Sequence, residues 1–343
     1  MNRIAGITSN TAPWEILRAA GFSPRMLQND PGPTPYADRF MEDVFERRFR
    51  VGFDRLCAGA WSDVEVLVIP RTSEQEHKLY LYLREASRLG HSQNIPRLYL
   101  YNLLHSRSAE SYSYGLERTR QMVQDFRVTH DGLREAILES NRARAAVRAI
   151  LALRGHGPVK GSDAIRMIEG FYTQNRGEFA DRAQQTLTSL ESVPPITAPR
   201  ILIKGAPLDH TLLHQLIEEH GGNVIAEDDW RGSRAAGEAD VSVEGDPAVA
   251  IFEKYYYDAV SPRVHSPEYA DGWFNRQLEQ GQADGVLFYV PLKDDVVGWD
   301  YPRHLHFVQS RGLPSVLIRE SGEPGSNPAL MEQIATFVGS LRA

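Results

Sequence analysis

Cysteine is nearly absent from this chain of 343 residues, since it occurs only as Cys57. One thiol excludes an internal disulfide and any mononuclear metal site built from several thiolates of this chain. Cys57 stands before the apolar stretch at 64–69 rather than after it. We therefore interpret it as a buried, unreactive thiol, because a free cysteine commonly behaves as a small apolar residue.

Long apolar runs and an excess of positive charge are also missing. No apolar run approaches the ~20 residues that cross a bilayer, and the N-terminal stretch MNRIAGITSNTAPWE lacks the pattern of a signal peptide. The chain has 38 basic and 45 acidic residues, a net charge of −7, and no basic block. Binding of nucleic acid without sequence preference needs clustered lysine and arginine. We expect a cytoplasmic protein that binds neither nucleic acid nor a membrane.

The composition that remains is typical of a folded protein, and the length indicates more than one core. Apolar residues make up 42% of the chain and charged residues 24%, which argues against disorder. A chain of this length exceeds what one hydrophobic core usually organises, so we expect two lobes.

Alternating strand and helix patterns indicate an N-terminal α/β lobe at residues 1–108. Apolar runs predict strands at 4–8, 22–27, 64–69 and 96–101, and helical spacing predicts helices at 14–20 and 74–89. Strand, helix and strand joined by short connections are typical of a parallel sheet.

Helical periodicity replaces this alternation at residues 109–195, with segments at 112–126, 133–153, 163–172 and 178–190. An arginine stripe runs along the second segment and its end: Arg142, Arg144, Arg148 and Arg154. We interpret the stripe as the solvated face of a long helix. A basic interaction surface is the alternative.

The α/β rhythm returns at residues 196–343, after the linker PPITAP at 194–199. We predict strands at 200–204, 223–226, 285–290 and 313–318, and helices at 208–220, 274–280, 301–310 and 330–341. The expected fold class is α/β, with two Rossmann- or flavodoxin-like lobes that contain parallel sheets and are joined by a helical segment.

Polar residues follow several of the predicted strands, where open parallel sheets bind ligands. One group comprises Lys293, Asp294 and Asp295, and a second comprises Asp228, Asp229 and Arg234. Such a set can do general acid–base work or bind a polar ligand. Solvated turn residues are the simpler interpretation of both groups.

Histidines and a glycine-rich stretch offer weaker candidates. His210 and His214 are spaced i, i+4, but HTLLH lacks the glutamate of a zinc protease. We interpret them as surface residues of an amphipathic helix, with a metal site as the alternative. We interpret the stretch SGEPGSN at 321–327 as a plain loop, with a phosphate site at the start of a helix as the alternative.

Four stretches match, in order, the pattern of one protein family: IAGITSNTAPWEILRAAGFSPRML at 4–27, DVEVLVIPRTSEQEHKLYLYLRE at 63–85, 200–234 with its DD-x-x-G-x-R turn, and 283–322. The chain thereby resembles the subunits of 2-hydroxyacyl-CoA dehydratases and benzoyl-CoA reductases, of the 2-hydroxyglutaryl-CoA dehydratase D-component type. The resemblance covers both lobes and implies a [4Fe–4S] cluster held by cysteines at strand-end turns, with one-electron transfer to a CoA thioester.

The cysteine positions are where this chain departs from the pattern. They are occupied by Ser73, by Trp230 inside the DD-x-x-G-x-R turn, and by Lys293 or Asp294. Thiolates hold such clusters, so we expect this chain to bind no cofactor itself and a [4Fe–4S] cluster to belong to a partner subunit. Two interpretations of Trp230 stay open: it fills the space that the cluster vacated, or it covers a surface loop.

These observations define a candidate site and three hypotheses. The candidate substrate-binding residues are Ser73, Asp229, Trp230, Arg234, Lys293 and Asp294, and no catalytic residue is assigned. In the first hypothesis the chain is a cluster-free subunit, forms a heterodimer with a homologous iron–sulfur subunit, and contributes to an acyl-CoA site in a cleft between lobes. The second is a standalone acyl-CoA- or small-molecule-binding protein or non-redox enzyme that uses polar cleft residues. The third is a purely structural partner subunit.

Overall fold

A computed structural model describes residues 3–28, 32–71, 73–104, 106–208, 210–258, 267–280, 282–320 and 327–342. The chain forms two compact units, each built from three segments. Unit 1 comprises Met1–Arg142, Tyr172–Gly177 and Ala239–Val264, and unit 2 comprises Ala143–Phe171, Glu178–Glu238 and His265–Ala343. The helical stretch 109–195 is divided between the two units, and the three consecutive domains of the sequence analysis stay a prediction.

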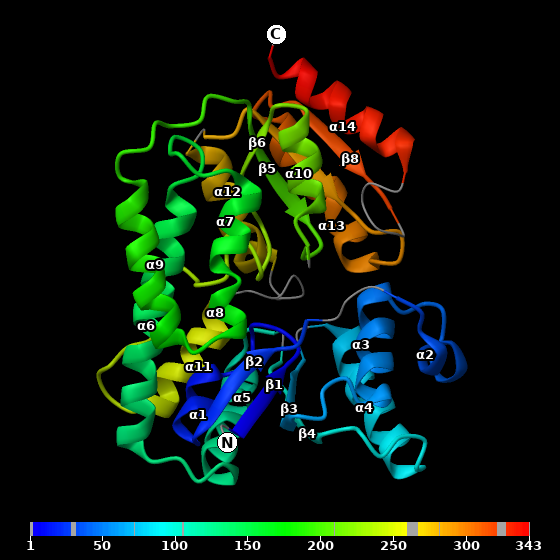
Figure 1. Cartoon of the computed structure of the whole chain (residues 1–343), viewed down its shortest axis with the longest axis vertical. Helices are drawn as coiled ribbons and strands as arrows, with labels where there is room; N and C mark the ends of the chain where they lie inside the picture. Colours follow the sequence, from blue (N-terminus) through cyan, green and yellow to red (C-terminus); the bar gives the residue numbers. More distant parts are fainter. Residues whose placement is uncertain are drawn as a thin grey trace. The chain divides into compact units, whose positions relative to one another are not determined.

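Unit 1 contains a four-stranded parallel sheet in the order β2-β1-β3-β4 (Figure 1). Its strands are β1 (Arg3–Ile7), β2 (Phe22–Met26), β3 (Val64–Pro70) and β4 (Arg97–Tyr101). All four predicted strands are confirmed within one or two residues. Pro70 was expected to lie beyond β3, but it is the last paired residue of that strand and lies opposite Tyr101.

Helices surround this sheet, and several of them were not predicted. The helices of unit 1 are α1 (Trp14–Ala19), α2 (Pro35–Phe40), α3 (Arg47–Ala58), α4 (Glu74–Arg88), α5 (Ala109–Asp125) and α11 (Pro247–Tyr257), with parts of α6 (His130–Ala152) and α8 (Gly170–Thr173). From α3, Phe49 and Phe53 join an apolar cluster that includes Leu67 of β3. Cys57 lies on α3 and is 1% exposed, and burial raises the pKa of its thiol to about 12. The prediction of a buried thiol is confirmed.

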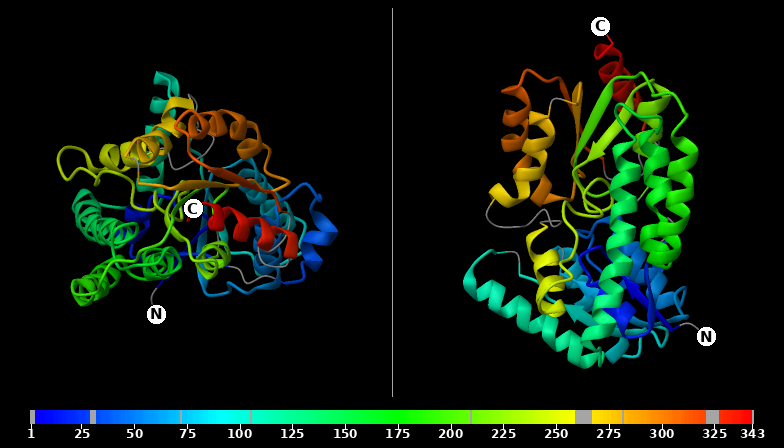
Figure 2. Two further views of the ribbon diagram at one scale, coloured as in Figure 1. Left: turned by 90° about the horizontal axis from the view of Figure 1, so that it is seen from above. Right: turned by 90° about the vertical axis from the view of Figure 1, so that its left-hand side faces the viewer.

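Unit 2 contains a second four-stranded parallel sheet, in the order β6-β5-β7-β8. Its strands are β5 (Arg200–Gly205), β6 (Asn223–Glu227), β7 (Gly285–Tyr289) and β8 (Ser315–Ile318), and its helices are α7 (Gly161–Ile168), most of α9 (Arg176–Leu190), α10 (Leu212–Glu219), α12 (Pro267–Glu279), α13 (Asp295–Gln309) and α14 (Pro328–Ser340). Figure 2 shows α12 and α13, in gold and orange, on one face of this sheet, and α10 and α14 on the other. The predicted α/β fold with two parallel sheets is confirmed.

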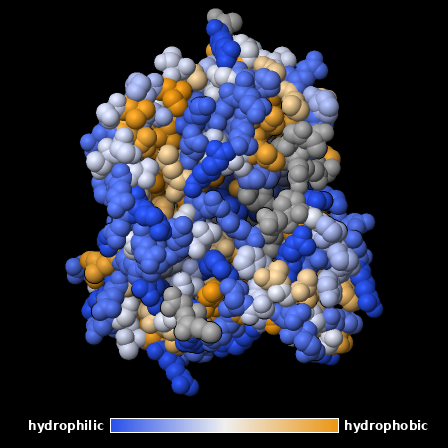
Figure 3. All heavy atoms as spheres, in the orientation of Figure 1, coloured by the Kyte–Doolittle hydropathy of each residue, from blue (hydrophilic) through white to orange (hydrophobic). Residues whose placement is uncertain are grey.

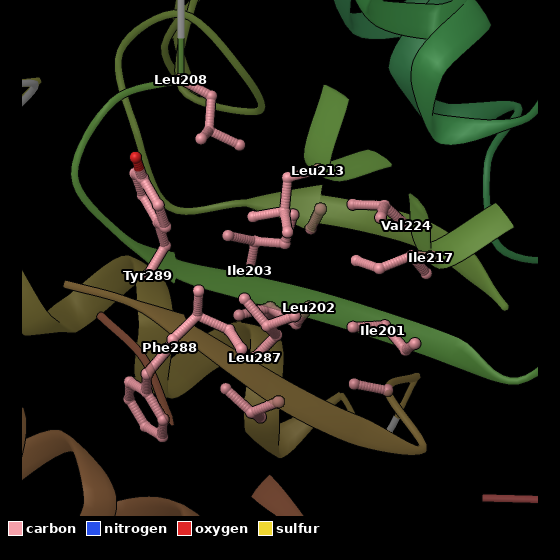
Figure 4. Packing of buried hydrophobic residues seen from close by; sticks show 14 of the residues in the cluster. Ile201, Leu202, Ile203, Leu208, Leu213, Ile217, Val224, Leu287, Phe288 and Tyr289 are labelled. Carbon is pink, nitrogen blue, oxygen red and sulfur yellow. The ribbon is translucent and has the colours of Figure 1, made fainter. Parts of the chain in front are cut away.

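The core of unit 2 lies on both faces of the central strands (Figure 4). Leu213 and Ile217 of α10 pack on one face, whereas Phe288 of β7 points to the other, where its ring meets Phe274 of α12 edge to face at 6.5 Å. Each fully buried leucine, isoleucine or phenylalanine stabilises the fold by ~1.5–3 kcal/mol. A Cβ at Gly205 would lie 1.8 Å from the carbonyl oxygen of Tyr289, so glycine is required where β5 ends beside β7.

The arginine stripe is not the solvated face that we expected. Arg142 is exposed, but Arg144 and Arg154 are only 2% and 5% exposed. The prediction was wrong because helical spacing identifies a face without revealing what covers it. A guanidinium at such a site needs a buried partner, and that of Arg154 is described below.

The surface in Figure 3 is mostly hydrophilic, and its apolar residues occur in small separate groups. Trp299 of α13 is the most exposed large apolar residue among the described part of the chain, at 84%. None of the described helices is long and apolar enough to span a membrane.

Candidate functional site

Both sheets share one strand order, in which the chain adds its second strand on one side of the first and its third on the other. Ligands of such sheets bind beyond the carboxyl ends of the strands where the order reverses. This switch point lies between β1 and β3 in unit 1 and between β5 and β7 in unit 2. Ser73 follows β3, and Lys293 and Asp294 follow β7. These predicted residues therefore lie in turns that flank a switch point.

In unit 1, Ser73 serves as the N-cap of α4. Its Oγ accepts a hydrogen bond of 3.1 Å from the backbone N–H of Glu76. The Glu76 carboxylate is buried and accepts hydrogen bonds from Thr8, through a short contact, and from Ser9 at 3.2 Å. Glu76 thus connects α4 to the turn after β1. Sequence reasoning missed this residue, although the spacing Ser-x-x-Glu is a known helix-start signal.

In unit 2, the turn after β6 begins with a buried ion pair. Asp228 accepts hydrogen bonds from Lys204, through a short contact, and from Arg234 at 3.0 Å. Burial opposes ionisation, yet the two cations hold the pKa of Asp228 below its ordinary value. The Lys204 ammonium also lies 5.2 Å from the ring centre of Phe274, and the Arg234 guanidinium 6.0 Å from that of Trp273. In this arrangement Arg234 neutralises Asp228 and is covered by α12.

Asp229, the next residue, is held by backbone groups. Its carboxylate accepts hydrogen bonds from the N–H groups of Arg231 at 2.7 Å, Gly232 at 2.5 Å and Leu208 at 3.5 Å. Burial and the nearby Glu227 carboxylate raise the pKa of Asp229 to about 6, despite these donors. Asp229 therefore changes its charge close to neutral pH, as a general acid or base requires.

Glu227, the last residue of β6, is the centre of a buried network. Arg154 Nη1 donates to it at 2.6 Å, and His214 Nε2 lies 2.7 Å away. Ser233 donates to the second carboxylate oxygen at 3.1 Å. A Cβ at Gly232 would come within 2.7 Å of the Glu227 Cβ, so glycine is required there. The surface interpretation of His214 was wrong, because its polar partner lies on a neighbouring strand.

Burial by itself raises the pKa of the Glu227 carboxyl, but Arg154 and His214 outweigh this effect and lower it to about 2. Glu227 is therefore an anion at neutral pH, and its two carboxylate oxygens are bonded by side chains of unit 2. This arrangement is typical of a structural ion pair rather than of a ligand site.

The remaining predicted residues are distributed over three strand-end turns. Trp230 is 6% exposed, so its indole is buried and does not cover a surface loop. Asp294 accepts a hydrogen bond of 3.1 Å from the Val297 N–H and caps α13, whereas Lys293 is exposed. Both belong to the turn after β7, which is separated by β5 from the turn that holds Trp230. Ser73 belongs to unit 1.

Comparison with known families matches residues 10–341 to "2-hydroxyglutaryl-CoA dehydratase, D-component". The chain belongs to this family. The family resemblance drawn from the sequence is thereby confirmed, and unit 2 explains its DD-x-x-G-x-R turn: Arg234 neutralises Asp228, and Gly232 packs against Glu227 and donates to Asp229.

One curated relative of the D-component chain is the "(R)-phenyllactyl-CoA dehydratase beta subunit" of Clostridium sporogenes, which is 19% identical over 212 residues. The match spans 60% of this chain and 56% of that protein. Two structures of the SBP FpvC of Pseudomonas aeruginosa, one with Mn²⁺ and one with Ni²⁺, are 12% and 13% identical. Both alignments cover 100% of this chain. The alignment covers 98% of the chain in the Mn²⁺ structure, with a TM-score of 0.23, and 96% of the chain in the Ni²⁺ structure, with a TM-score of 0.22.

The side chains of this D-component chain do not fit a thiolate-held cluster. Ser73 and Asp294 cap helices, Trp230 is an indole, and Cys57 lies on α3, away from the strand-end turns. Over the described ranges, no group of three or more histidine, cysteine, aspartate or glutamate side chains could hold a metal ion. SGEPGSN at 321–327 lies, except for its last residue, outside the described residues.

Proposed function

We propose that this chain is a D-component subunit that binds no iron–sulfur cluster with its own side chains and works with a homologous, cluster-bearing subunit. One observation carries the proposal. All motif residues of the DD-x-x-G-x-R turn are present and Arg234 donates a hydrogen bond to Asp228, yet a buried indole, Trp230, occupies the position of the cluster cysteine. An indole offers a single N–H donor and no thiolate.

Family membership supports the need for a partner. The curated relative is named as the beta subunit of a dehydratase, and a name of this kind implies at least one further subunit. A chain without thiolate ligands cannot store the electron that the family resemblance implies, so the redox step would take place on the partner. Under this proposal the D-component chain contributes to the binding of an acyl-CoA.

Co-purification tests the pairing. The full chain, tagged and produced in its native cell, is isolated under anaerobic conditions, and its partners are identified by mass spectrometry. An unrelated tagged protein serves as the control. We expect a homologous protein with cysteines at the positions of Ser73 and Trp230 to be enriched in near-equal amount. Recovery of the chain without any homologue would contradict the proposal.

A second candidate function is a non-redox enzyme or standalone binding protein, and Asp229 favours it. A buried carboxyl with a pKa of about 6 can donate or accept a proton without any cluster. Turnover of an acyl-CoA by the purified chain alone, lost in Asp229→Asn, would favour this function over the first. Tight binding without turnover would support a standalone binding protein, unless co-purification recovers the homologous partner.

A further inference from the structure

The carboxyl edge of the unit 2 sheet carries a glutamate that sequence reasoning missed. Glu320 follows β8, and its carbonyl oxygen accepts a hydrogen bond of 3.2 Å from the Leu292 N–H. Leu292 belongs to the turn after β7, which flanks the switch point between β5 and β7. Glu320 therefore lies beside one of the two turns that flank the switch point, where ligands of open parallel sheets bind.

Glu320 differs from the other buried acids of the described residues, because one of its carboxyl oxygens has no hydrogen-bond partner among them. Eight acidic side chains are buried among the described residues: Glu15, Asp54, Glu76, Glu227, Asp228, Asp229, Asp271 and Glu320. The first seven accept hydrogen bonds from side chains or backbone N–H groups. Glu320 is 7% exposed, and its Oε2 has no hydrogen-bond partner in the described part of the chain.

An unpaired buried carboxylate is costly, and native proteins keep such groups mainly where a ligand or a reaction uses them. Burial raises the pKa of the Glu320 carboxyl above its ordinary value. A protonated carboxyl offers an O–H donor and a carbonyl acceptor. A carbonyl or amide of a ligand can accept from such an O–H and thereby give the unpartnered Oε2 a hydrogen bond.

The start of α13 does not favour an anionic ligand group at this position. The N-terminus of α13, which would otherwise attract a phosphate, is capped by Asp294 and carries Asp295 in its first turn. In contrast, the neighbouring Leu292 presents an apolar side chain that is 51% exposed. A ligand carbonyl attached to an apolar hydrocarbon group fits both features, since the carbonyl can bind the Glu320 carboxyl and the hydrocarbon group can pack on Leu292.

We propose that Glu320 is a binding residue for the carbonyl end of an acyl group, beside Leu292 in the turn after β7. This inference rests on the proposed function because it takes an acyl-CoA as the ligand. It adds the part of the ligand that this edge of unit 2 recognises: the acyl group rather than the nucleotide.

The test compares butanoyl-CoA and free CoA as probes, by titration calorimetry of the full chain. Glu320→Met keeps the length of the side chain and removes both polar groups, whereas Glu320→Gln keeps a donor and an acceptor. Glu332→Met, an exposed position on α14, is the matched control. We expect the Kd for butanoyl-CoA to rise about tenfold or more in Glu320→Met, as the loss of a buried hydrogen bond implies. The Gln variant should keep most of the affinity, and binding of free CoA should not change.

Thermal unfolding separates a binding role from a structural one. If Glu320 serves a ligand, Glu320→Met melts at or above the temperature of the wild type, because an unpaired buried carboxyl is replaced by an apolar group. A lower melting temperature, unchanged butanoyl-CoA binding, an equal loss for free CoA, or a wild type that does not bind butanoyl-CoA would each overturn the inference. The subunit proposal would still be decided separately, by co-purification of the homologous partner.

Discussion

Replacing Arg154 by methionine tests the buried network of unit 2. Arg154 and Glu227 are each 1% exposed in their side chains, and they are joined by a hydrogen bond of 2.6 Å. Arg154 also donates to Ser233 at 2.8 Å. The variant Arg154→Met leaves His214 and Ser233 as the remaining side-chain partners of Glu227. The removal of one member of a buried ion pair leaves its partner insufficiently compensated.

The shifted pKa of Glu227 sets the size of the expected loss in folding stability. Its ordinary value is 4.5 and its folded value about 2, which corresponds to about 3 kcal/mol of stabilisation at neutral pH. Because the pKa is lowered on folding, this stabilisation is complete above pH 4.5 and is lost as the pH falls toward 2. Because Arg154 shares this effect with His214, Arg154→Met should cost up to about 3 kcal/mol at pH 7 and less than half of that at pH 3.

Hydrogen exchange, followed by mass spectrometry of peptides that cover β5 and β6, measures the stability of unit 2 by itself. Arg166→Met is the control, because Arg166 forms an exposed ion pair of 2.9 Å with Asp163 on α7. Such a surface pair contributes at most about 1 kcal/mol. A loss in Arg154→Met no larger than in the control, or equally large at pH 7 and pH 3, would refute the reasoning.

Three further predictions concern single side chains. Because the pKa of Asp229 is raised to about 6, its charge reduces stability as the pH rises through 6; we expect Asp229→Asn to be more stable than the wild type by about 3 kcal/mol at pH 8 and nearly equal to it at pH 4, by thermal unfolding. Equal melting at both values would contradict this. Cys57 should resist a thiol reagent at pH 7.5 and react at once in urea, since its thiol is buried. Rapid labelling of Cys57 in the folded protein would show that the thiol is accessible. Gly232→Ala should cost about 2 kcal/mol or more in denaturant unfolding, through overlap with Glu227, and a neutral substitution would show that the turn relaxes.

The strands were predictable because each is a short apolar run bounded by turn residues. Val64–Ile69 and Gly285–Val290 are examples, and β3 and β7 occupy nearly the same residues. Parallel pairing followed from the alternation of strand and helix. The strand orders, and with them the switch points, required the structure, since periodicity does not specify which strands are neighbours.

Helices with many charged residues were harder to identify. No element was predicted for α3, whose sequence RRFRVGFDRLCA carries four arginines among its apolar residues. The start of α13 was also predicted too late, at Tyr301 instead of Asp295. The helix begins earlier because Asp294 caps it, and it includes Pro302.

The candidate site could be predicted only as a set of strand-end turns. Asp229 is the predicted residue whose environment best suits acid–base chemistry, whereas Ser73 and Asp294 serve as helix caps. Arg154 was unforeseen as a partner of Glu227 because the two residues are 73 positions apart. Glu320 was missed because a single glutamate after a strand has no distinguishing pattern, and its lack of partners is visible only in three dimensions.

Iron analysis of the isolated chain tests the central claim most directly. The full chain is purified without partners, treated with iron and sulfide under anaerobic conditions, and desalted. We predict a colourless protein with negligible iron, because Cys57 is the single thiol and lies on a helix of unit 1. About four irons per chain, together with the visible absorbance of a [4Fe–4S] cluster, would contradict the account.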